Sequence, residues 1–188
     1  LLRCHQLFLD EPEELRRWQK KYRYILVDEF QDISPLQYQI VRMLALPENN
    51  LFIVGDDDQS IYAFRGSDPG IMLGFETDYP GAVRIMLSKN FRSRKEIVDF
   101  ASAVIARNRH RFPKTIEAVQ GPGGRALRYQ TEDTLQEYAL VLQNIQKELL
   151  QGTAPERIAV LFRTQTLARP LISEFVRKRT AIRSGAVP

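Results

Sequence analysis

The feature that most constrains the fold is a series of short apolar runs that each lead into polar or acidic residues. Residues 24–27 run into Asp28 and Glu29, and residues 51–54 run into a glycine and three aspartates. Unbroken apolar runs of this length are typical of strands in parallel sheets, which are buried on both faces. Residues 83–87 form a third such run. Because helical patterns separate the runs, we predict an α/β fold with parallel sheets flanked by helices.

Helix-start signals fill the intervals between these runs. Ser34-Pro35 and Asp68-Pro69 each place an N-cap residue before a first-turn proline, a common way for a helix to begin. Residues 110–124 are polar and rich in glycine and proline, so we expect a loop there. The predicted helices cover residues 13–21, 35–46, 69–77, 94–107 (with Ser93 as N-cap), 134–150 and 171–178, and two further strands cover residues 126–129 and 158–162.

Composition excludes several classes of protein. No apolar run approaches the roughly 20 residues that a membrane-spanning helix needs. The single cysteine, Cys4, rules out an intramolecular disulfide and a cysteine-based zinc cluster, so we expect a cytoplasmic protein. The net charge of +4 is compatible with nucleic acid, but basic surfaces are often merely solvated, so charge alone does not establish a partner.

The acids after the first run suit a catalytic site. Ligands of open α/β sheets bind at the carboxyl ends of the strands, where Asp28 and Glu29 are expected. An aspartate there can hold a Mg²⁺ ion that bridges nucleotide phosphates, and the adjacent glutamate can position or deprotonate an attacking water. Acidic pairs after strands also serve as plain solvated loops, so this pair by itself leaves both readings open.

Three blocks taken together resemble motifs II, III and IV of the UvrD/Rep group of superfamily 1 helicases. They read Asp-Glu-Phe-Gln-Asp at 28–32, Gly-Asp-Asp-Asp-Gln-Ser-Ile-Tyr-Ala-Phe-Arg-Gly at 55–66, and Asn-Phe-Arg-Ser at 90–93. The resemblance extends from about Leu15 to Lys178. It implies parts of two RecA-like P-loop NTPase domains with ATP between them, which move 3′ to 5′ along single-stranded DNA and unwind DNA in repair or replication.

The resemblance also implies roles for individual residues around ATP and Mg²⁺. Asp28 would bind Mg²⁺, and Glu29 would be the catalytic base. Gln59 would sense the γ-phosphate and relay its presence to the DNA side. Arg92 would be an arginine finger from the second domain. Phe91 stands where the family usually has the tyrosine that stacks on adenine, so stacking is kept while the hydroxyl is lost.

A further set of residues would contact single-stranded or partially duplex DNA. Phe64 stands where the family commonly has a tryptophan that stacks on a base, and Tyr62 and Arg65 flank it. Core packing is the alternative for both aromatic rings. Residues 159–164 resemble motif IVa, which would bring Arg163 and Thr164 to the DNA backbone, although an arginine after a strand is often simply exposed to solvent.

The resemblance also divides the chain. We expect residues 1–20 to lead in from an accessory region, residues 21–88 to be the second half of one motor domain, and residues 89–188 to begin the other. No Gly-x-x-x-x-Gly-Lys-[Ser/Thr] loop occurs in the sequence. We therefore expect the chain to be a middle piece of a larger protein that by itself neither binds ATP tightly nor hydrolyses it.

Three alternatives remain open at this point. The chain could be the helicase part of a helicase–nuclease complex, which shares the same motifs. It could be a non-catalytic interaction module that has kept the fold and binds nucleic acid or protein. It could also be a metal-dependent nuclease with a two-metal site. The acids of that last alternative are Asp28, Glu29, Asp32 and residues 56–58.

Overall fold

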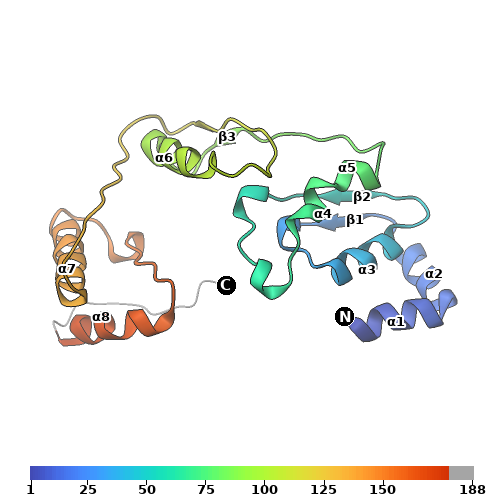
Figure 1. Cartoon of the computed structure of the whole chain (residues 1–188), viewed down its shortest axis with the longest axis horizontal. Helices are drawn as coiled ribbons and strands as arrows, with labels where there is room; N and C mark the ends of the chain where they lie inside the picture. The colour runs from blue at the N-terminus through green and yellow to red at the C-terminus, as the bar shows by residue number, and fades with distance from the viewer. Residues whose placement is uncertain (178–188) are drawn as a thin grey trace. The chain divides into compact units, whose positions relative to one another are not determined.

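The computed structural model describes residues 1–177 of the chain. Contacts between Cα atoms divide the chain into two compact units, Leu1–Ala126 and Leu127–Pro188, whose elements are labelled in Figure 1. Within the described residues, no helix is long and apolar enough to cross a membrane. Helices alternate with two pairs of parallel strands, so the predicted α/β class is confirmed.

The first unit begins with two helices that pack against a third. They are α1 (Leu2–Asp10) and α2 (Pro12–Lys21), and both contact α3 (Pro35–Ala45). The side chain of Gln19 on α2 donates to the carbonyl of Met43 on α3 at 2.7 Å. The predicted helix at 13–21 is confirmed as α2.

The predicted strands at 24–27 and 51–54 form a parallel pair. Strand β1 (Ile25–Val27) pairs with β2 (Leu51–Ile53) in a register that sets Val27 beside Ile53. Helix α3 makes the crossover between them, and Figure 1 shows it running alongside the pair. As predicted, Ser34 caps this helix, through a reciprocal capping box with Gln37.

The core of the first unit forms around Phe30, which is completely buried. Phe30 meets Tyr38 and Phe75 edge to face, at ring distances of 5.9 and 5.7 Å. Tyr38 in turn donates from its hydroxyl to Asp78 at 2.6 Å. The apolar side chains around this centre are Val27, Ile33, Val41, Ile53, Ile71, Met72 and Tyr79.

The helix predicted at 69–77 is split in two. Helix α4 (Pro69–Leu73) ends at Gly74, and α5 (Phe75–Asp78) follows at once. Asp68 caps α4 as predicted, with its side chain accepting from the Gly70 amide at 2.8 Å. Gly74 is both the C-cap of α4 and the N-cap of α5, and glycine is the residue that most favours such an interruption.

The third predicted strand, at 83–87, is wrong. These residues form no ladder, and the side chains of Val83, Ile85 and Leu87 are exposed. The pairing occurs just beyond them, between β3 (Lys89–Asn90) and β4 (Glu117–Ala118), which are parallel. A strand needs a neighbouring strand to pair with its backbone hydrogen-bonding groups. In the described part of the chain the neighbour is β4, which is two residues long and pairs with Lys89 and Asn90 and not with residues 83–87.

Helix α6 (Lys95–Ile105) connects these two strands. Its N-cap is Arg94, without a side-chain cap, so the prediction of Ser93 as cap is wrong. The Asn90 side chain instead accepts from the amides of Arg92 and Ser93, at 3.0 and 2.8 Å. The loop predicted at residues 110–124 contains no helix, and the two residues of β4 are its regular secondary structure.

The described part of the second unit contains two α-helices and a short 3₁₀ helix, η4 (Pro155–Arg157). Helix α7 (Thr134–Leu150) has the predicted bounds and is capped by Asp133. Helix α8 (Gln165–Arg177) begins six residues before the predicted start, and Lys178 lies outside the described residues. The strands predicted at 126–129 and 158–162 are wrong, because neither segment has a pairing partner in the described chain. The core of the unit consists of Tyr138, Leu142, Leu171 and Phe175.

Candidate functional site

The ends of β1 and β2 lie together, as parallel strands in register require. The amide of Val54 donates to the Val27 carbonyl at 2.8 Å, and the amide of Phe30 donates back to Val54 at 2.9 Å. The residues that leave the two strands therefore emerge at the same edge of the pair. This places the turn that begins with Asp28 and Glu29 against the turn that begins with Gly55.

Glu29 has a left-handed backbone, with φ 51° and ψ 42°. This region is uncommon for residues with a side chain, and it costs of order 1–3 kcal/mol where it occurs. The Asp28 side chain accepts from the Glu29 amide at 2.9 Å and helps to hold the turn. Strain of this kind is concentrated at functional sites, so the backbone supports a functional rather than a merely solvated acidic pair.

Gln31 joins the two turns. Its side chain is 2% exposed and hydrogen-bonded at both ends. The Gln31 Nε2 group donates to Glu29 Oε2 at 2.7 Å, and the Asp56 amide donates to Gln31 Oε1 at 3.0 Å. The hydroxyl of Ser60 donates to the Gln31 carbonyl at 3.2 Å. One buried side chain thus connects the first acidic turn to the second.

Gly55 leaves room for this connection. A Cβ atom at position 55 would lie 2.7 Å from Gln31 Oε1 and 3.1 Å from the Gln31 backbone nitrogen. Neither contact is one that a real Cβ makes comfortably, so a glycine is needed where the two turns approach each other.

Gln59 is held by Asp56. The Gln59 side-chain amide donates to Asp56 Oδ2 at 2.8 Å, while Asp56 Oδ1 accepts from the Asp58 amide at 3.2 Å. Asp56 is the N-cap of the 3₁₀ turn η2 (Asp57–Gln59) that carries Gln59. A continuous set of hydrogen bonds therefore runs from Glu29 through Gln31 and Asp56 to Gln59.

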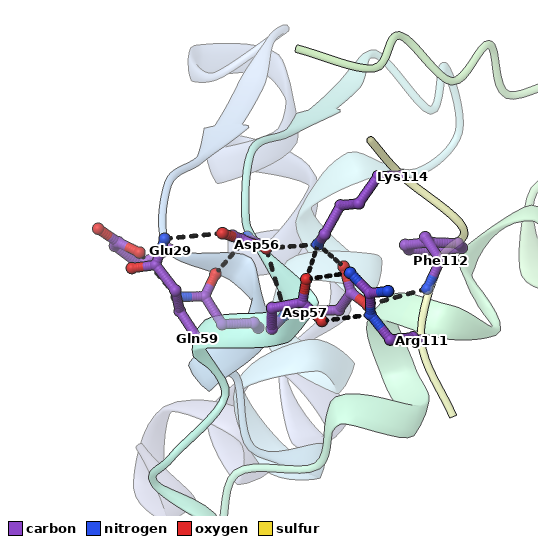
Figure 2. A network of polar contacts seen from close by, with 9 residues as sticks. Glu29, Asp56, Asp57, Gln59, Arg111, Phe112 and Lys114 are labelled. Carbon is purple, nitrogen blue, oxygen red and sulfur yellow. Dashed lines mark hydrogen bonds and ion pairs between the residues drawn. The ribbon is translucent and has the colours of Figure 1, made fainter. Parts of the chain in front are cut away.

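A segment that contains Arg111 and Lys114 contacts the three aspartates at 56–58. In Figure 2, Lys114 and Arg111 reach into the row of acids that follows β2. Lys114 Nζ forms ion pairs with Asp56, Asp57 and Asp58. Arg111 binds Asp58 through two nitrogens, Nε at 2.7 Å and Nη2 at 2.6 Å. The amide of Phe112 also donates to Asp57, at 2.9 Å. We call the five charged residues of this cluster, Asp56, Asp57, Asp58, Arg111 and Lys114, the ionic clamp.

The ionic clamp favours the charged forms of Asp56 and Asp58. Burial by itself would raise the pKa of Asp56 and Asp58, but hydrogen bonds from Lys114 to both, from Gln59 to Asp56 and from Arg111 to Asp58 outweigh it, and both pKa values are lowered. Burial would likewise lower the pKa of Lys114, yet its three carboxylate partners raise it. The shifted pKa values of Asp56, Asp58 and Lys114 therefore favour their charged forms.

Asp32 has the opposite environment. Its Oδ1 atom is buried without a hydrogen-bond partner, and burial, followed by the charge of Glu29, raises the pKa of the Asp32 carboxyl. Asp32 lines a cavity of about 330 Å³ together with Val27, Asp28 and Glu29. The first acidic turn thus borders a hollow in which two acids, Asp28 and Glu29, lie exposed.

The aromatic residues of the second turn form a small cluster at the surface, with their rings tilted by 49° to each other. Phe64 is 73% exposed, so the alternative of core packing is wrong for this ring. Tyr62 is half-buried, and its ring lies 6.0 Å from that of Phe64. The Arg65 guanidinium covers both rings, at 4.8 Å from Tyr62 and 5.5 Å from Phe64. These residues surround the 3₁₀ turn η3 (Ala63–Arg65) and offer both a ring face and a positive charge.

Phe91 and Arg92 are exposed, and their backbone is fixed by neighbours on the β3–β4 pair. The Gln120 side chain donates to the carbonyls of Phe91 and Arg92, at 2.6 and 3.0 Å. In the described residues no hydrogen bond or ion pair joins Arg92 to Asp28, Glu29 or Gln59. The structure therefore brings the two acidic turns together but does not bring the predicted arginine finger into contact with them.

Arg163 and Thr164 lie in the second unit, just before α8, and both are exposed. The Thr164 carbonyl accepts from the Leu167 amide at 3.1 Å, at the start of that helix. Their predicted contact with DNA stays a prediction.

The acids do not form a two-metal centre. Across residues 1–177, no group of three or more His, Cys, Asp or Glu side chains is arranged to hold a metal ion. The ionic clamp explains why, since two basic side chains already form ion pairs with Asp56, Asp57 and Asp58. Asp28, in contrast, is exposed at the cavity and has no basic partner among the described residues. A single carboxylate of this kind suits Mg²⁺, which takes most of its ligands from water and phosphate.

Sequence reasoning missed Gln31, Arg111 and Lys114. Gln31 lies inside the first motif, but nothing local shows that its side chain turns inward toward residue 56. Arg111 and Lys114 lie in a segment that was read only as a polar loop. The one available signal was charge, because three consecutive aspartates beside a strand end need nearby cations if they are to be buried.

Comparisons with known proteins match two consecutive parts of the chain to two domains of one protein family. Residues 1–80 match the UvrD/REP helicase N-terminal domain, and residues 85–184 match the UvrD-like helicase C-terminal domain. The chain is 45% identical over 89% of its length to YjcD of Bacillus subtilis (strain 168), named as an ATP-dependent DNA helicase. It is 40% identical over 91% of its length to the ATP-dependent DNA helicase PcrA of Leuconostoc citreum. It spans 22% and 23% of the lengths of these two relatives.

Proposed function

Because the chain belongs to the UvrD-like helicase family, we propose that its residues are part of a motor that uses ATP hydrolysis to unwind DNA. The observation that carries the proposal is the hydrogen-bonded connection from Glu29 through Gln31 and Asp56 to Gln59. A motor must couple the hydrolytic site to the site that responds to nucleotide and DNA, and this connection joins the two turns to which those tasks are assigned.

Four residues of the chain act around the nucleotide. Asp28 holds the Mg²⁺ ion of Mg·ATP, which neutralises phosphate charge when it is bound. Glu29 orients the attacking water and takes its proton, and the left-handed backbone at Glu29 sets the direction of its carboxylate. Gln59 responds to the γ-phosphate. Phe91 stacks on adenine, for which its exposed ring is suited.

Arg92 acts as an arginine finger, and domain movement delivers it. The residue is exposed and its side chain is not engaged with the acidic turns, which suits a group that reaches the phosphates only in the closed state. The proposed motor domains are residues 21–88, which contain both acidic turns, and residues 89–188; this division differs from the two compact units of the fold, which separate after Ala126. The boundary of the two family matches, between residues 80 and 85, supports this division.

Single-stranded DNA binds across exposed aromatic and basic side chains. Phe64 offers a free ring face on which any base can stack, and Arg65 beside it supplies a positive charge for the backbone. Tyr62, Arg163 and Thr164 complete the set. Movement is 3′ to 5′, and the unwinding serves DNA repair or replication.

The test of the proposal is Glu29→Gln in the full-length gene product. The amide keeps the shape and the contact with Gln31 but cannot accept a proton, so DNA-stimulated ATP turnover should fall by about 10²–10⁴-fold. ATP affinity should stay nearly unchanged, because the amide leaves Asp28 intact. Steady-state ATPase assays and equilibrium binding of a fluorescent ATP analogue measure the two quantities.

Glu13→Gln is the matched control. Glu13 pairs with Arg16 on the exposed surface of α2, so the same chemical change should leave turnover unaltered. Turnover in Glu29→Gln equal to that of Glu13→Gln would remove Glu29 from the hydrolytic step and with it the proposed function.

The 188-residue chain by itself should not hydrolyse ATP, because its sequence contains no loop of the Gly-x-x-x-x-Gly-Lys-[Ser/Thr] type. Such loops bind the phosphates through successive backbone amides and a lysine. DNA-stimulated ATPase activity in the purified chain would show that another segment performs this task.

A further inference from the structure

The ionic clamp is unusually complete for a contact between distant segments. Its three acids follow β2, and its two bases lie more than 50 residues later in a segment without helix. The side chain of Lys114 is 6% exposed, and that of Asp57 is 3% exposed. Buried charges are rare unless they are paired, so this arrangement is specific rather than a chance surface contact.

Lys114 donates hydrogen bonds to Asp56 and Asp57 and forms an ion pair with Asp58 at 3.1 Å. An ammonium group has three N–H donors, and Lys114 faces three separate carboxylates. Arg111 adds a two-pronged contact to Asp58, the geometry in which a guanidinium binds a carboxylate most specifically. The clamp holds three acids against two bases, so one negative charge remains.

Asp56 divides its two oxygens between the clamp and Gln59. Oδ1 binds Lys114 and the Asp58 amide, and Oδ2 accepts from the Gln59 side chain. The position of the Lys114 ammonium therefore helps to fix the rotation of the carboxylate that holds Gln59. Without Lys114, three adjacent carboxylates would repel one another, and Asp56 Oδ1 would keep the longer contact with the Asp58 amide but lose its charged partner.

We propose that Lys114 is a positioning residue for Gln59, acting through Asp56 to orient its side chain for the nucleotide, while Arg111 holds Asp58 in the same cluster. This inference rests on the proposed function, because it takes Gln59 to be the group that responds to the γ-phosphate. The acids of the clamp lie in the segment that matches the N-terminal helicase domain, and the bases lie in the segment that matches the C-terminal domain. Through the clamp, a residue of the segment that matches the C-terminal domain, Lys114, helps to position the side chain of Gln59.

The first test needs no enzymatic activity. The side-chain amide signals of Gln59 are assigned by NMR in the 188-residue chain and in Lys114→Met, and the exchange of these protons with water is measured. Loss of the ammonium should release the Gln59 amide, so its signals should shift and its exchange should become several-fold faster. The backbone amide of Phe30, in the core, reports whether the unit is still folded.

Lys95→Met is the matched control. Lys95 forms an ion pair with Asp99 on the exposed surface of α6, so it loses the same charge and a comparable contact. It should leave Gln59 unchanged. If Lys114→Met fails to fold, Lys114→Gln carries the same test, because it removes the charge and keeps a polar side chain of similar size. A Gln59 amide that is unchanged in a folded clamp variant would overturn the proposal.

The second test measures function in the full-length gene product. Lys114→Met should lower kcat for DNA-stimulated ATP hydrolysis, and the double variant with Gln59→Ala should be no slower than Gln59→Ala alone, because both changes remove the same step. Lys114→Arg, which keeps the charge, should restore part of the loss. If the fold-decrease in kcat of the double variant equals the product of the fold-decreases of the two single variants, the positioning role is overturned.

The two tests separate the inference from the function on which it rests. A Gln59 amide released in Lys114→Met with kcat unchanged would support the contact and contradict the role assigned to Gln59. An unchanged amide would contradict the contact whatever happens to kcat.

Discussion

Gly55 and Gln31 meet at the point where the two acidic turns come closest. A Cβ atom added at position 55 would lie 2.7 Å from the Gln31 side-chain oxygen, and Met72 would also be crowded, at 3.2 Å. Gly55→Ala should therefore displace Gln31 and reduce the free energy of unfolding by about 1–3 kcal/mol, the usual cost of overpacking. Urea unfolding followed by circular dichroism measures the change.

Gly81→Ala provides the comparison for this prediction. A Cβ at position 81 meets nothing within 4 Å, so the same substitution should be neutral or slightly stabilising. Equal stabilities for the two variants would show that the approach of Gln31 to Gly55 is not tight in solution.

Phe64→Ala tests the DNA surface at a single residue. The exposed ring contributes little to the core, so the free energy of unfolding should stay the same. Binding of a single-stranded oligonucleotide should weaken by about 1–3 kcal/mol if one base stacks on the ring. Fluorescence anisotropy of a labelled oligonucleotide measures the loss, and Phe64→Trp should retain binding.

Phe100 is a second exposed ring in the same unit and serves as a control. Phe100→Ala should leave oligonucleotide binding unchanged. A loss of equal size in both variants would indicate general surface hydrophobicity and not a stacking site at Phe64.

The positions of single site residues could be predicted where they depend on the type of side chain and on its place after a predicted strand. Asp28 and Glu29 follow a strand, and Gln59 follows the next strand, so their common edge could be predicted. Gln31 could not, because its importance comes from its burial between two turns that are distant in sequence. Lys114 could not either, since a separation of 56 to 58 residues from its partners leaves no periodic signal.

Helix α3 links the two strands that carry the site, and its start can be weakened on its own. Ser34 and Gln37 form a capping box, with the Ser34 amide donating to Gln37 Oε1 at 2.8 Å. Ser34→Ala should reduce the free energy of unfolding by about 1 kcal/mol. Thermal and urea unfolding of the purified chain provide the measurement.

Ser173→Ala is the paired control for the cap. Ser173 lies within α8 and its hydroxyl donates to the Arg169 carbonyl, so its loss should have little effect on stability. A Ser34→Ala variant as stable as Ser173→Ala would mean that packing on the core, and not the capping box, determines where α3 begins.

Helices and strands differed in how well their positions could be predicted. Helices α2, α3 and α7 match their predicted ranges closely, because caps and prolines are local signals. The strands predicted at 83–87, 126–129 and 158–162 are wrong for a different reason. An apolar run becomes a strand only when another strand pairs with it, and that partner is a property of the fold and not of the run.

For the molecule as a whole, the ionic clamp contributes to the dependence of stability on acid. Asp56 and Asp58 have pKa values below their ordinary value of 3.8. Their contribution to stability is therefore complete above that pH and is lost as pH falls through the lowered pKa. Asp32 has the opposite sign, because its raised pKa favours the protonated form in the folded chain.

Removal of the clamp bases should flatten this response. In the double variant Arg111→Met and Lys114→Met, the drop in Tm between about pH 4 and pH 2 should be smaller than in the parent chain, since the acids no longer have partners to lose. Differential scanning calorimetry over this range provides the comparison. Parallel pH profiles for the two proteins would show that other carboxyls dominate acid unfolding.

Family membership was visible in the sequence because three motifs recur in a fixed order, and the two domain matches confirm it. The matching relatives are about four times as long as this chain. The partnership between the turns after β1 and β2 and the segment around Lys114 was not visible, because it depends on how the chain folds back on itself.

The planar side-chain amide of Gln31 has a mechanical consequence. Its nitrogen and oxygen belong to one rigid group, so a rotation that brings the oxygen toward residue 56 carries the nitrogen away from residue 29. The Gln31 side chain therefore couples the two turns: a shift of Asp56 that keeps its hydrogen bond to Gln31 also changes the hydrogen bond between Gln31 and Glu29. A spectroscopic label on either turn would report on both.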